Sequence, residues 1–203
     1  MVSKIDICNQ GLVLIGANLI ASFTDNTVES KVANQLYETT LRAMLTKARW
    51  RFATKQEQLT KVTTDPLDKW DSAYQIPNDT ILIHTATVSD NVIQYDRYNE
   101  FLYTNTGQND VVVLHYTYQP HEKEFPDYFT QALVFELASL FAGAIARNDQ
   151  LSLLYEKRAR QQLVVARSME SQTQTSRKLN TSLLIEVRNR ATASGVRAVV
   201  PDS

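Results

Sequence analysis

Apolar residues recur along this chain at two different spacings, and the change of spacing divides the sequence. A helical spacing, with apolar residues three and four positions apart, occupies the first 50 residues and returns after residue 122. The stretch between carries aromatic and β-branched residues in short runs separated by Asp, Asn, Pro and Gly. Such runs are typical of strands joined by turns. The pattern therefore predicts a β region between two helical regions.

Two helices are predicted before the β region. Ser3 with Asp6 three residues later forms a capping-box pattern, and apolar positions then recur until Gly16. After a polar turn, Thr27 can cap a second helix. The first apolar stripe comprises Ile5, Cys8, Leu12 and Ile15, and the second comprises Ala33, Leu36, Tyr37, Leu41, Met44, Leu45 and Ala48. Because Cys8 belongs to the first stripe, we expect a buried structural thiol there.

The β region is predicted to form a small antiparallel sheet. The link from Asn105 to Asn109 contains Gly107, which suits a turn with positive φ, so we expect the last two strands to form a hairpin. The predicted strands are Arg51–Leu59, Tyr74–Ile76, Ile81–Val88, Val92–Asp96, Phe101–Thr104 and Val111–Tyr118.

Two further helices are predicted after the β region. The third begins near Pro126 and is apolar nearly all round, so we expect it to be the central helix. One side of it carries Phe129, Ala132, Leu133, Leu137, Leu140, Phe141, Ala144 and Ile145, and the other carries Val134, Phe135, Ala138 and Ala142. The fourth is predicted to turn inward Leu151, Leu154, Tyr155, Ala159, Ala166 and Met169, and outward Lys157, Arg158, Arg160 and Arg167.

These elements predict an α+β fold with four parts. About four helices form an antiparallel bundle, because short connections favour antiparallel neighbours, and the β domain is inserted between the second and third helices. The bundle comprises residues 1–49 and 123–170, the β domain residues 50–122, and an extended C-terminal arm residues 171–203.

The composition of the arm differs from that of the rest of the chain. From Ser168 onward the sequence is polar apart from the clusters Leu183–Val187 and Val196–Val200. Such a segment buries too little apolar surface to offset the entropy of ordering it alone. Residues 156–203 carry nine basic and four acidic residues, which gives this part a net charge of +5. Because the whole chain has a net charge of −1, the rest of it has a net charge of −6. We therefore expect the arm to become ordered on an acidic surface of another subunit.

Side chains that could perform catalysis or bind a metal are few. His84, His115 and His121 lack helical metal-ligand spacing, and the chain has a single cysteine, so we expect no metal site. The three acids in DPLDKWD, Asp65, Asp68 and Asp71, lack the other ligands of a calcium loop and are interpreted as solvated turn residues. No glycine-rich phosphate loop and no nucleophile elbow occurs, so we expect neither a cofactor nor an enzyme.

Nucleic-acid binding is an alternative, because basic residues follow one another through the last third of the chain. They are Arg158, Arg160, Arg167, Arg177, Lys178, Arg188, Arg190 and Arg197. A duplex-binding domain is expected to be basic overall, whereas this chain has a pI of about 6.3. Trp50, Phe52, Trp70 and Tyr74 could stack bases, but we interpret them as packing the junction between helix and sheet.

Several short motifs resemble one family of phage proteins in type and in order. The motifs are Leu14-Ile15-Gly16-Ala17, Trp50-Arg51-Phe52, Trp70 through Tyr74-Gln75-Ile76-Pro77-Asn78-Asp79, Tyr116, Pro120, Phe125-Pro126 and the Ala/Leu-rich stretch Ala132 to Ala146. Over roughly residues 3–170 the chain resembles the podovirus head-to-tail adaptors, also called tail tubular protein A.

The resemblance implies a structural virion protein rather than an enzyme. It implies a ring of twelve copies that is assembled in the host cytoplasm, docks under the portal protein and links the capsid vertex to the tail nozzle protein. DNA would pass through the ring during ejection without specific binding, and no membrane would be involved. From composition, we expect the arm to bind the portal through Leu183, Leu184, Ile185, Val187, Arg188, Arg190, Arg197, Val199 and Val200, with Val196 beside the last two.

Overall fold

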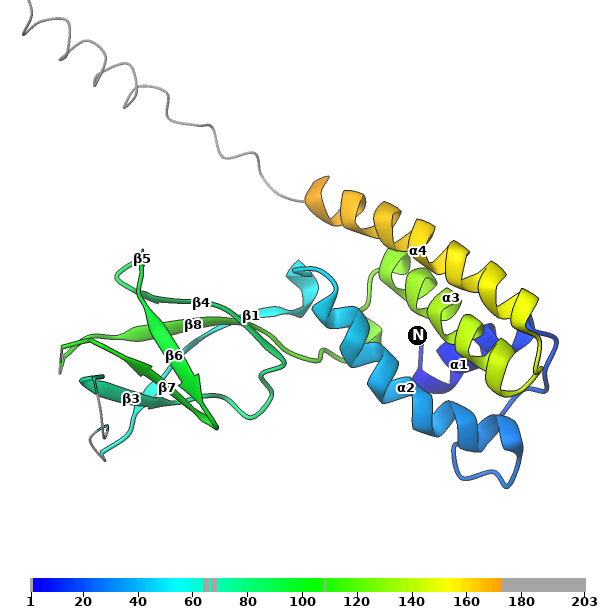
Figure 1. The fold of residues 1–203 in the computed structure, drawn as a ribbon, viewed down its shortest axis with the longest axis horizontal. Coiled ribbons are helices and arrows are strands. Elements are labelled where there is room, and N and C mark those ends of the chain that lie inside the picture. The colour runs from blue at the N-terminus through cyan, green and yellow to red at the C-terminus, as the bar shows by residue number, and fades with distance from the viewer. Residues whose placement is uncertain (1, 64–65, 67–68, 108, 173–203) are drawn as a thin grey trace, which may run out of the picture. The chain divides into compact units, whose positions relative to one another are not determined.

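The computed structural model describes residues 2–63, 66, 69–107 and 109–172. Within these residues the chain has four α-helices and two small antiparallel sheets, so the mixed α+β class and the number of helices agree with the prediction. All eight strands lie between the second and third helices along the chain (Figure 1). The predicted arm lies almost entirely outside the described residues.

The first two helices begin as the capping patterns predict. Helix α1, Lys4–Leu14, starts with a capping box in which Ser3 and Asp6 bond each other's backbone N–H groups at 3.2 and 2.9 Å. Helix α2, Val28–Thr46, starts at Thr27, whose hydroxyl accepts from the backbone of Ser30 at 3.2 Å. Helix α1 ends two residues before the predicted stop, and Gly16 then adopts a φ of 73°.

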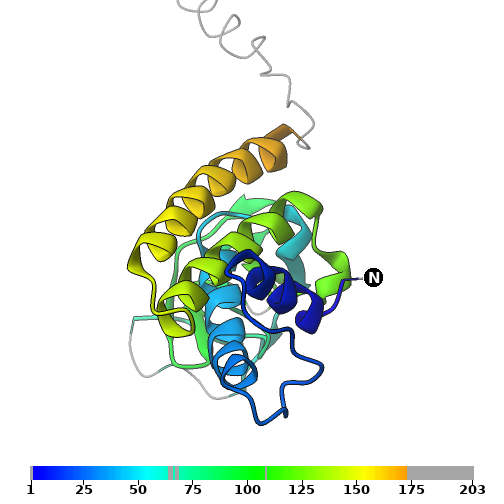
Figure 2. The same ribbon diagram turned by 90° about the vertical axis from the view of Figure 1, so that its right-hand side faces the viewer.

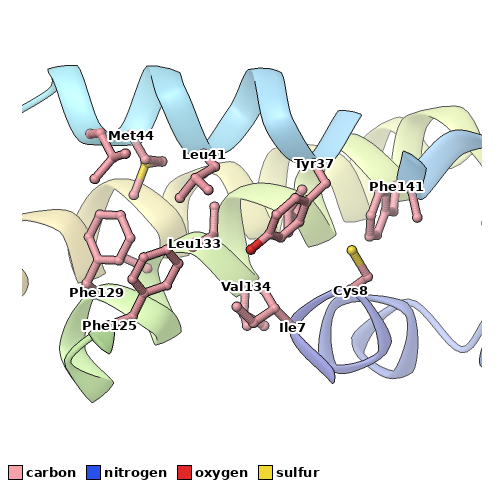
Figure 3. Packing of buried hydrophobic residues seen from close by; sticks show 14 of the residues in the cluster. Ile7, Cys8, Tyr37, Leu41, Met44, Phe125, Phe129, Leu133, Val134 and Phe141 are labelled. Atoms are coloured by element: carbon pink, nitrogen blue, oxygen red, sulfur yellow. The ribbon is translucent and has the colours of Figure 1, made fainter. Parts of the chain in front are cut away.

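Helix α3, Asp127–Ala144, is the most enclosed of the helices and begins directly after Pro126. It is buried on both of its predicted sides, for example at Leu133 and Ala138, while Leu140 is 40% exposed. Helix α1 packs closely against it because Gly11 has no side chain: a Cβ there would lie 3.3 Å from the Phe141 ring. Figure 3 shows side chains of α1, α2 and α3 meeting in one cluster, including Ile7, Cys8, Tyr37, Leu41, Met44, Phe129, Leu133 and Phe141.

Helix α4, Asp149–Gln172, lies at the outside of the helical region (Figure 2). It is buried along one narrow line only. The predicted inward residues Tyr155, Ala159 and Ala166 are buried, and the predicted outward basic residues are exposed. The prediction was wrong for Leu154 and Met169, which are 44% and 46% exposed. Helix α4 makes few close backbone contacts with the other elements, so residues on the flanks of its buried line stay exposed.

The strands form two four-stranded sheets rather than the one predicted. The first has the order β1-β8-β4-β5 and the second β2-β3-β7-β6, all antiparallel. Their bounds are β1 Thr54–Gln58, β2 Thr60–Lys61, β3 Ser72–Gln75, β4 Leu82–Val88, β5 Asn91–Val92, β6 Tyr95–Tyr98, β7 Phe101–Thr104 and β8 Val112–Thr117. Residues 51–53, predicted as strand, form a short 3₁₀ helix.

The predicted hairpin between the last two strands is wrong. Strand β7 pairs with β6 and β3, whereas β8 pairs with β1 and β4 in the other sheet. The tight turns lie elsewhere: Tyr98 faces Phe101 across a two-residue turn in which Asn99 has a φ of 54°, and Ser89 and Asp90 have φ values of 47° and 65° in the β4–β5 turn. Gly107 does not use a positive φ, and the link that contains it joins strands of different sheets.

Both sheets contribute to a second buried cluster, separate from that of the helices. Tyr74 and Leu102 come from the second sheet, and Leu114 and Tyr116 from the first. The hydroxyl of Tyr74 bonds that of Thr106 at 2.9 Å, which ties the crossing link to β3. The chain thus has one core in its helices and one in its strands.

The chain enters and leaves the β region at neighbouring points. The amide of Tyr118 donates to the Ala53 carbonyl at 2.9 Å, and the Trp50 indole donates to the Met44 carbonyl at 3.0 Å. Trp50, Phe52, Phe125 and Phe129 form a cluster with ring centroids 4.9 to 6.0 Å apart. The junction role predicted for Trp50 and Phe52 is therefore confirmed, whereas Tyr74 packs inside the sheets instead. The reason is that β3, which carries Tyr74, is a central strand.

Candidate interaction surfaces

The residues predicted to bind a portal lie outside the described part of the chain. These are Leu183, Leu184, Ile185, Val187, Arg188, Arg190, Arg197, Val199 and Val200. Candidate surfaces can therefore be built only from the residues up to Gln172, the last residue of α4. Two such surfaces stand out among the described residues, one on α4 and one between α1 and α3.

Polar anchors hold α4 on the other helices at both of its ends. Near its start, the Tyr155 hydroxyl donates to the Leu14 carbonyl at 2.7 Å, and Ser152 donates to the Ser139 carbonyl at 2.8 Å. Near its end, the Arg167 guanidinium donates to the Lys47 carbonyl. These contacts attach the helix without burying its flanks.

The carboxylate of Glu170 is the most buried of the anchors. Its side chain is 7% exposed, and it accepts from the backbone N–H of Arg51 at 2.6 Å and from the Tyr128 hydroxyl at 2.5 Å. Burial, and then the neighbouring Glu170 carboxylate, raises the pKa of Tyr128 well above its usual range. Glu170 therefore joins the last turn of α4 to α3 and to the start of the β region.

The surface of α4 that faces away from these anchors carries large apolar side chains. We define the outer face of α4 as Leu153, Leu154, Lys157, Arg158, Val164, Val165 and Met169. Leu153 is 65% exposed and Val164 66% exposed. Single exposed apolar residues are ordinary, but this helix carries five, in two groups, Leu153 and Leu154 near its start and Val164, Val165 and Met169 nearer its end. We therefore treat this face as a candidate interaction surface.

The basic side chains of α4 are mostly engaged by the chain itself. Arg160 pairs with Glu156, Arg158 lies 5.4 Å from the centre of the Tyr155 ring, and Arg167 donates to the Lys47 carbonyl. Lys157 has no ion pair within residues 2–63, 66, 69–107 and 109–172. The helix therefore presents a mixed apolar and positive surface rather than a row of free cations.

A groove runs between α1 and α3. Its volume is about 940 Å³, and Val13, Leu19, Val134 and Phe135 provide much of its apolar lining. Asp6 and Asp127 are the charged residues along it, and no basic residue lines it within the described part of the chain. Val13 and Leu19 are 60% and 62% exposed, so the groove presents apolar side chains to solvent together with the negative charges of Asp6 and Asp127.

The three histidines are placed apart from any site. His84 lies at a bulge in β4, where its Nε2 is 2.8 Å from the Thr117 hydroxyl. Burial, with Arg49 and His115 nearby, lowers its pKa. His121 lies at the start of the short 3₁₀ helix Glu122–Glu124, six residues after His115, and is exposed. Within the described residues, no three potential metal-binding side chains come together.

The remaining candidate residues are accounted for locally. Burial raises the pKa of the Cys8 thiol to about 12, in agreement with the predicted structural role. Asp71 is exposed, as expected for a turn residue, while Asp65 and Asp68 fall outside the described residues. Trp70 lies under the Lys69 ammonium, 4.9 Å from the ring centre, and not at the junction predicted for it. None of the helices in the described part has the length and apolar composition of a membrane span.

Comparison of the sequence with models of known protein families finds no match, and comparison with curated proteins finds no similar chain. The two surfaces above therefore have to be interpreted from their own chemistry. Sequence reasoning missed both of them. The signal for the first was present in Leu153, Val164 and Val165, apolar residues that fall off the inward stripe of α4.

Proposed function

We propose that this chain is a structural head-to-tail adaptor, with twelve copies forming a ring between a phage portal and the tail nozzle. The observation that carries the proposal is the presence of two different apolar surfaces on the helices, the outer face of α4 and the α1–α3 groove. A closed ring is built from heterologous contacts, for which each subunit needs two unlike surfaces.

In this proposal the parts of the chain have separate roles. The four helices form an antiparallel bundle that makes the ring body, and the two sheets, which have their own core, face the nozzle. The C-terminal arm, residues 171–203, binds the portal through the apolar and basic residues named above. The acidic excess of the remaining chain would weaken contact with the phosphates of passing DNA.

The alternative, a nucleic-acid-binding regulatory module, gains little support from α4. Three of its basic side chains are held by an acid, a ring or a carbonyl of the same chain, as described above. Such a module should bind DNA with an affinity that falls steeply as salt rises. A complete lack of DNA binding at low salt would exclude this alternative.

Truncation tests the adaptor function. A chain ending at Thr175 retains all of α4 and should unfold at the same temperature as the full chain. It should not bind isolated portal rings, whereas the full chain should, as measured by co-sedimentation. Equal binding of both chains to portal rings would show that the arm is not the portal-binding element. No binding by either chain would contradict the adaptor function itself.

A further inference from the structure

The two surfaces differ in charge in a way that suits them to each other. The groove between α1 and α3 carries Asp6 and Asp127, and none of its described lining residues is basic. The outer face of α4 carries Lys157 and no acidic residue, and Arg158, which lies over the Tyr155 ring, adds positive charge at its edge. Opposite charges around apolar centres favour one docking arrangement and disfavour the pairing of either surface with a copy of itself.

The groove has a volume of about 940 Å³ and is open to solvent at Val13 and Leu19. On α4, the span from Lys157 to Val165 holds both positive charges and two of the apolar residues of the outer face.

Within one chain the groove borders on the inward side of α4, because Leu14 and Phe135, which line the groove, contact Tyr155. Helix α4 is fixed on its own bundle by this inward side, through Tyr155 and Glu170. Its outer face points away from that side, so the side chains that match the groove are available only to another molecule. A second copy of this chain supplies the matching surface.

We propose that the outer face of α4 of one copy docks in the α1–α3 groove of the next copy. The contact is heterologous, so each copy uses both surfaces and the association continues from copy to copy. This inference names the surfaces through which the copies of the proposed ring join. It rests on the proposed function for the closure of the ring.

Cysteine trapping tests the contact because the native thiol does not interfere. Cys8 is buried, which leaves it unreactive in the folded protein. We would prepare Val13→Cys in the groove and Val164→Cys on the outer face, both at exposed positions. Neither substitution removes a buried side chain, so both variants should fold.

The two variants are mixed in concentrated solution and oxidised mildly. We expect a covalent dimer joining the two different variants, in several-fold higher yield than from either variant alone. Val92→Cys is the matched control, since Val92 is 70% exposed on β5 and belongs to neither surface. An equal yield from Val92→Cys mixed with Val164→Cys, or from Val164→Cys alone, would overturn the proposal.

A second measurement does not depend on disulfide geometry. Val13→Arg places a positive charge in the groove, opposite the positive outer face, and should shift sedimentation toward monomers, whereas Val92→Arg should not. Equal association of the two variants would overturn the contact.

Mixed dimers without portal binding would sustain this contact and contradict the adaptor function. Portal binding without mixed dimers would contradict this contact alone.

Discussion

Helices α3 and α4 follow each other along the chain, yet they are buried to very different extents. Helix α3 is enclosed on both sides, and residues such as Leu133 and Phe141 are inaccessible to solvent. Helix α4 is longer, but only Tyr155, Ala159, Ala166 and Glu170 are buried on it. One helix builds the core, and the other leaves its large apolar side chains outside. The difference follows the sequence pattern, because α3 is apolar nearly all round, whereas α4 is mostly polar and carries apolar residues both on its buried line and on its exposed side.

The largest difference in stability between the two helices is expected when an apolar side chain is truncated on each. Phe141→Ala should lower the free energy of unfolding by about 3 to 5 kcal/mol, because it leaves a cavity in a closed core. Val164→Ala should lower it by less than about 0.5 kcal/mol, because Val164 is already exposed. Urea denaturation of both variants measures the loss of unfolding free energy in each. Similar losses for the two variants would show that α4 is packed as firmly as α3.

A smaller effect is expected from the anchor at the end of α4. Glu170→Ala removes the acceptor for the Arg51 amide and the Tyr128 hydroxyl and should cost about 1 to 3 kcal/mol. Since the anchor holds α4 in particular, hydrogen exchange should accelerate in α4 more than in α3. The matched control is Glu156→Ala on the same helix, because the ion pair of Glu156 is exposed. Uniform acceleration in both helices would contradict a local anchor.

The smallest effect concerns the hydroxyl that links the two helices. Tyr128→Phe removes one hydrogen bond to Glu170 and should cost about 1 kcal/mol at neutral pH. Because the pKa of Tyr128 is raised in the folded state, its contribution is complete below the usual value of 10.0 and is lost as the pH rises through the folded pKa. When the pH is raised from neutral to above 10.0, the Tyr128→Phe variant should therefore lose less stability than the parent protein.

Tyr37→Phe provides a comparison for that titration, because the pKa of Tyr37 is also raised by burial but its hydroxyl bonds Glu122 instead. If Tyr128→Phe and the parent lose stability equally at alkaline pH, as followed by circular dichroism in urea, then the hydroxyl does not couple α3 to α4.

Local signals in the sequence predicted the helices well because their causes are local. The capping residues Ser3 and Thr27 act within four residues of themselves, and the enclosed character of α3 follows from apolar residues all round it. The strand pairing was not predicted, because Gly107 offered a plausible turn while Asn99 formed the real one. Which strand is the partner depends on contacts between distant residues, and a single sequence does not record them.

The interaction surfaces were hidden for a related reason. Leu154 and Met169 have the same chemistry as buried residues, so their spacing alone placed them inward. Their exposure follows from how little of α4 the other elements cover, which is a property of the folded chain. The groove brings together α1 and α3, which are more than 100 residues apart in sequence.

The position of Glu170 also has a mechanical consequence. It is attached to Arg51, where the helices give way to the strands, and it lies two residues before the end of α4. A force applied to the C-terminal residues would reach that attachment before it reached the hydrophobic interior. Tension from a bound partner would thus be divided between the start of the strands, through Arg51, and helix α3, through Tyr128.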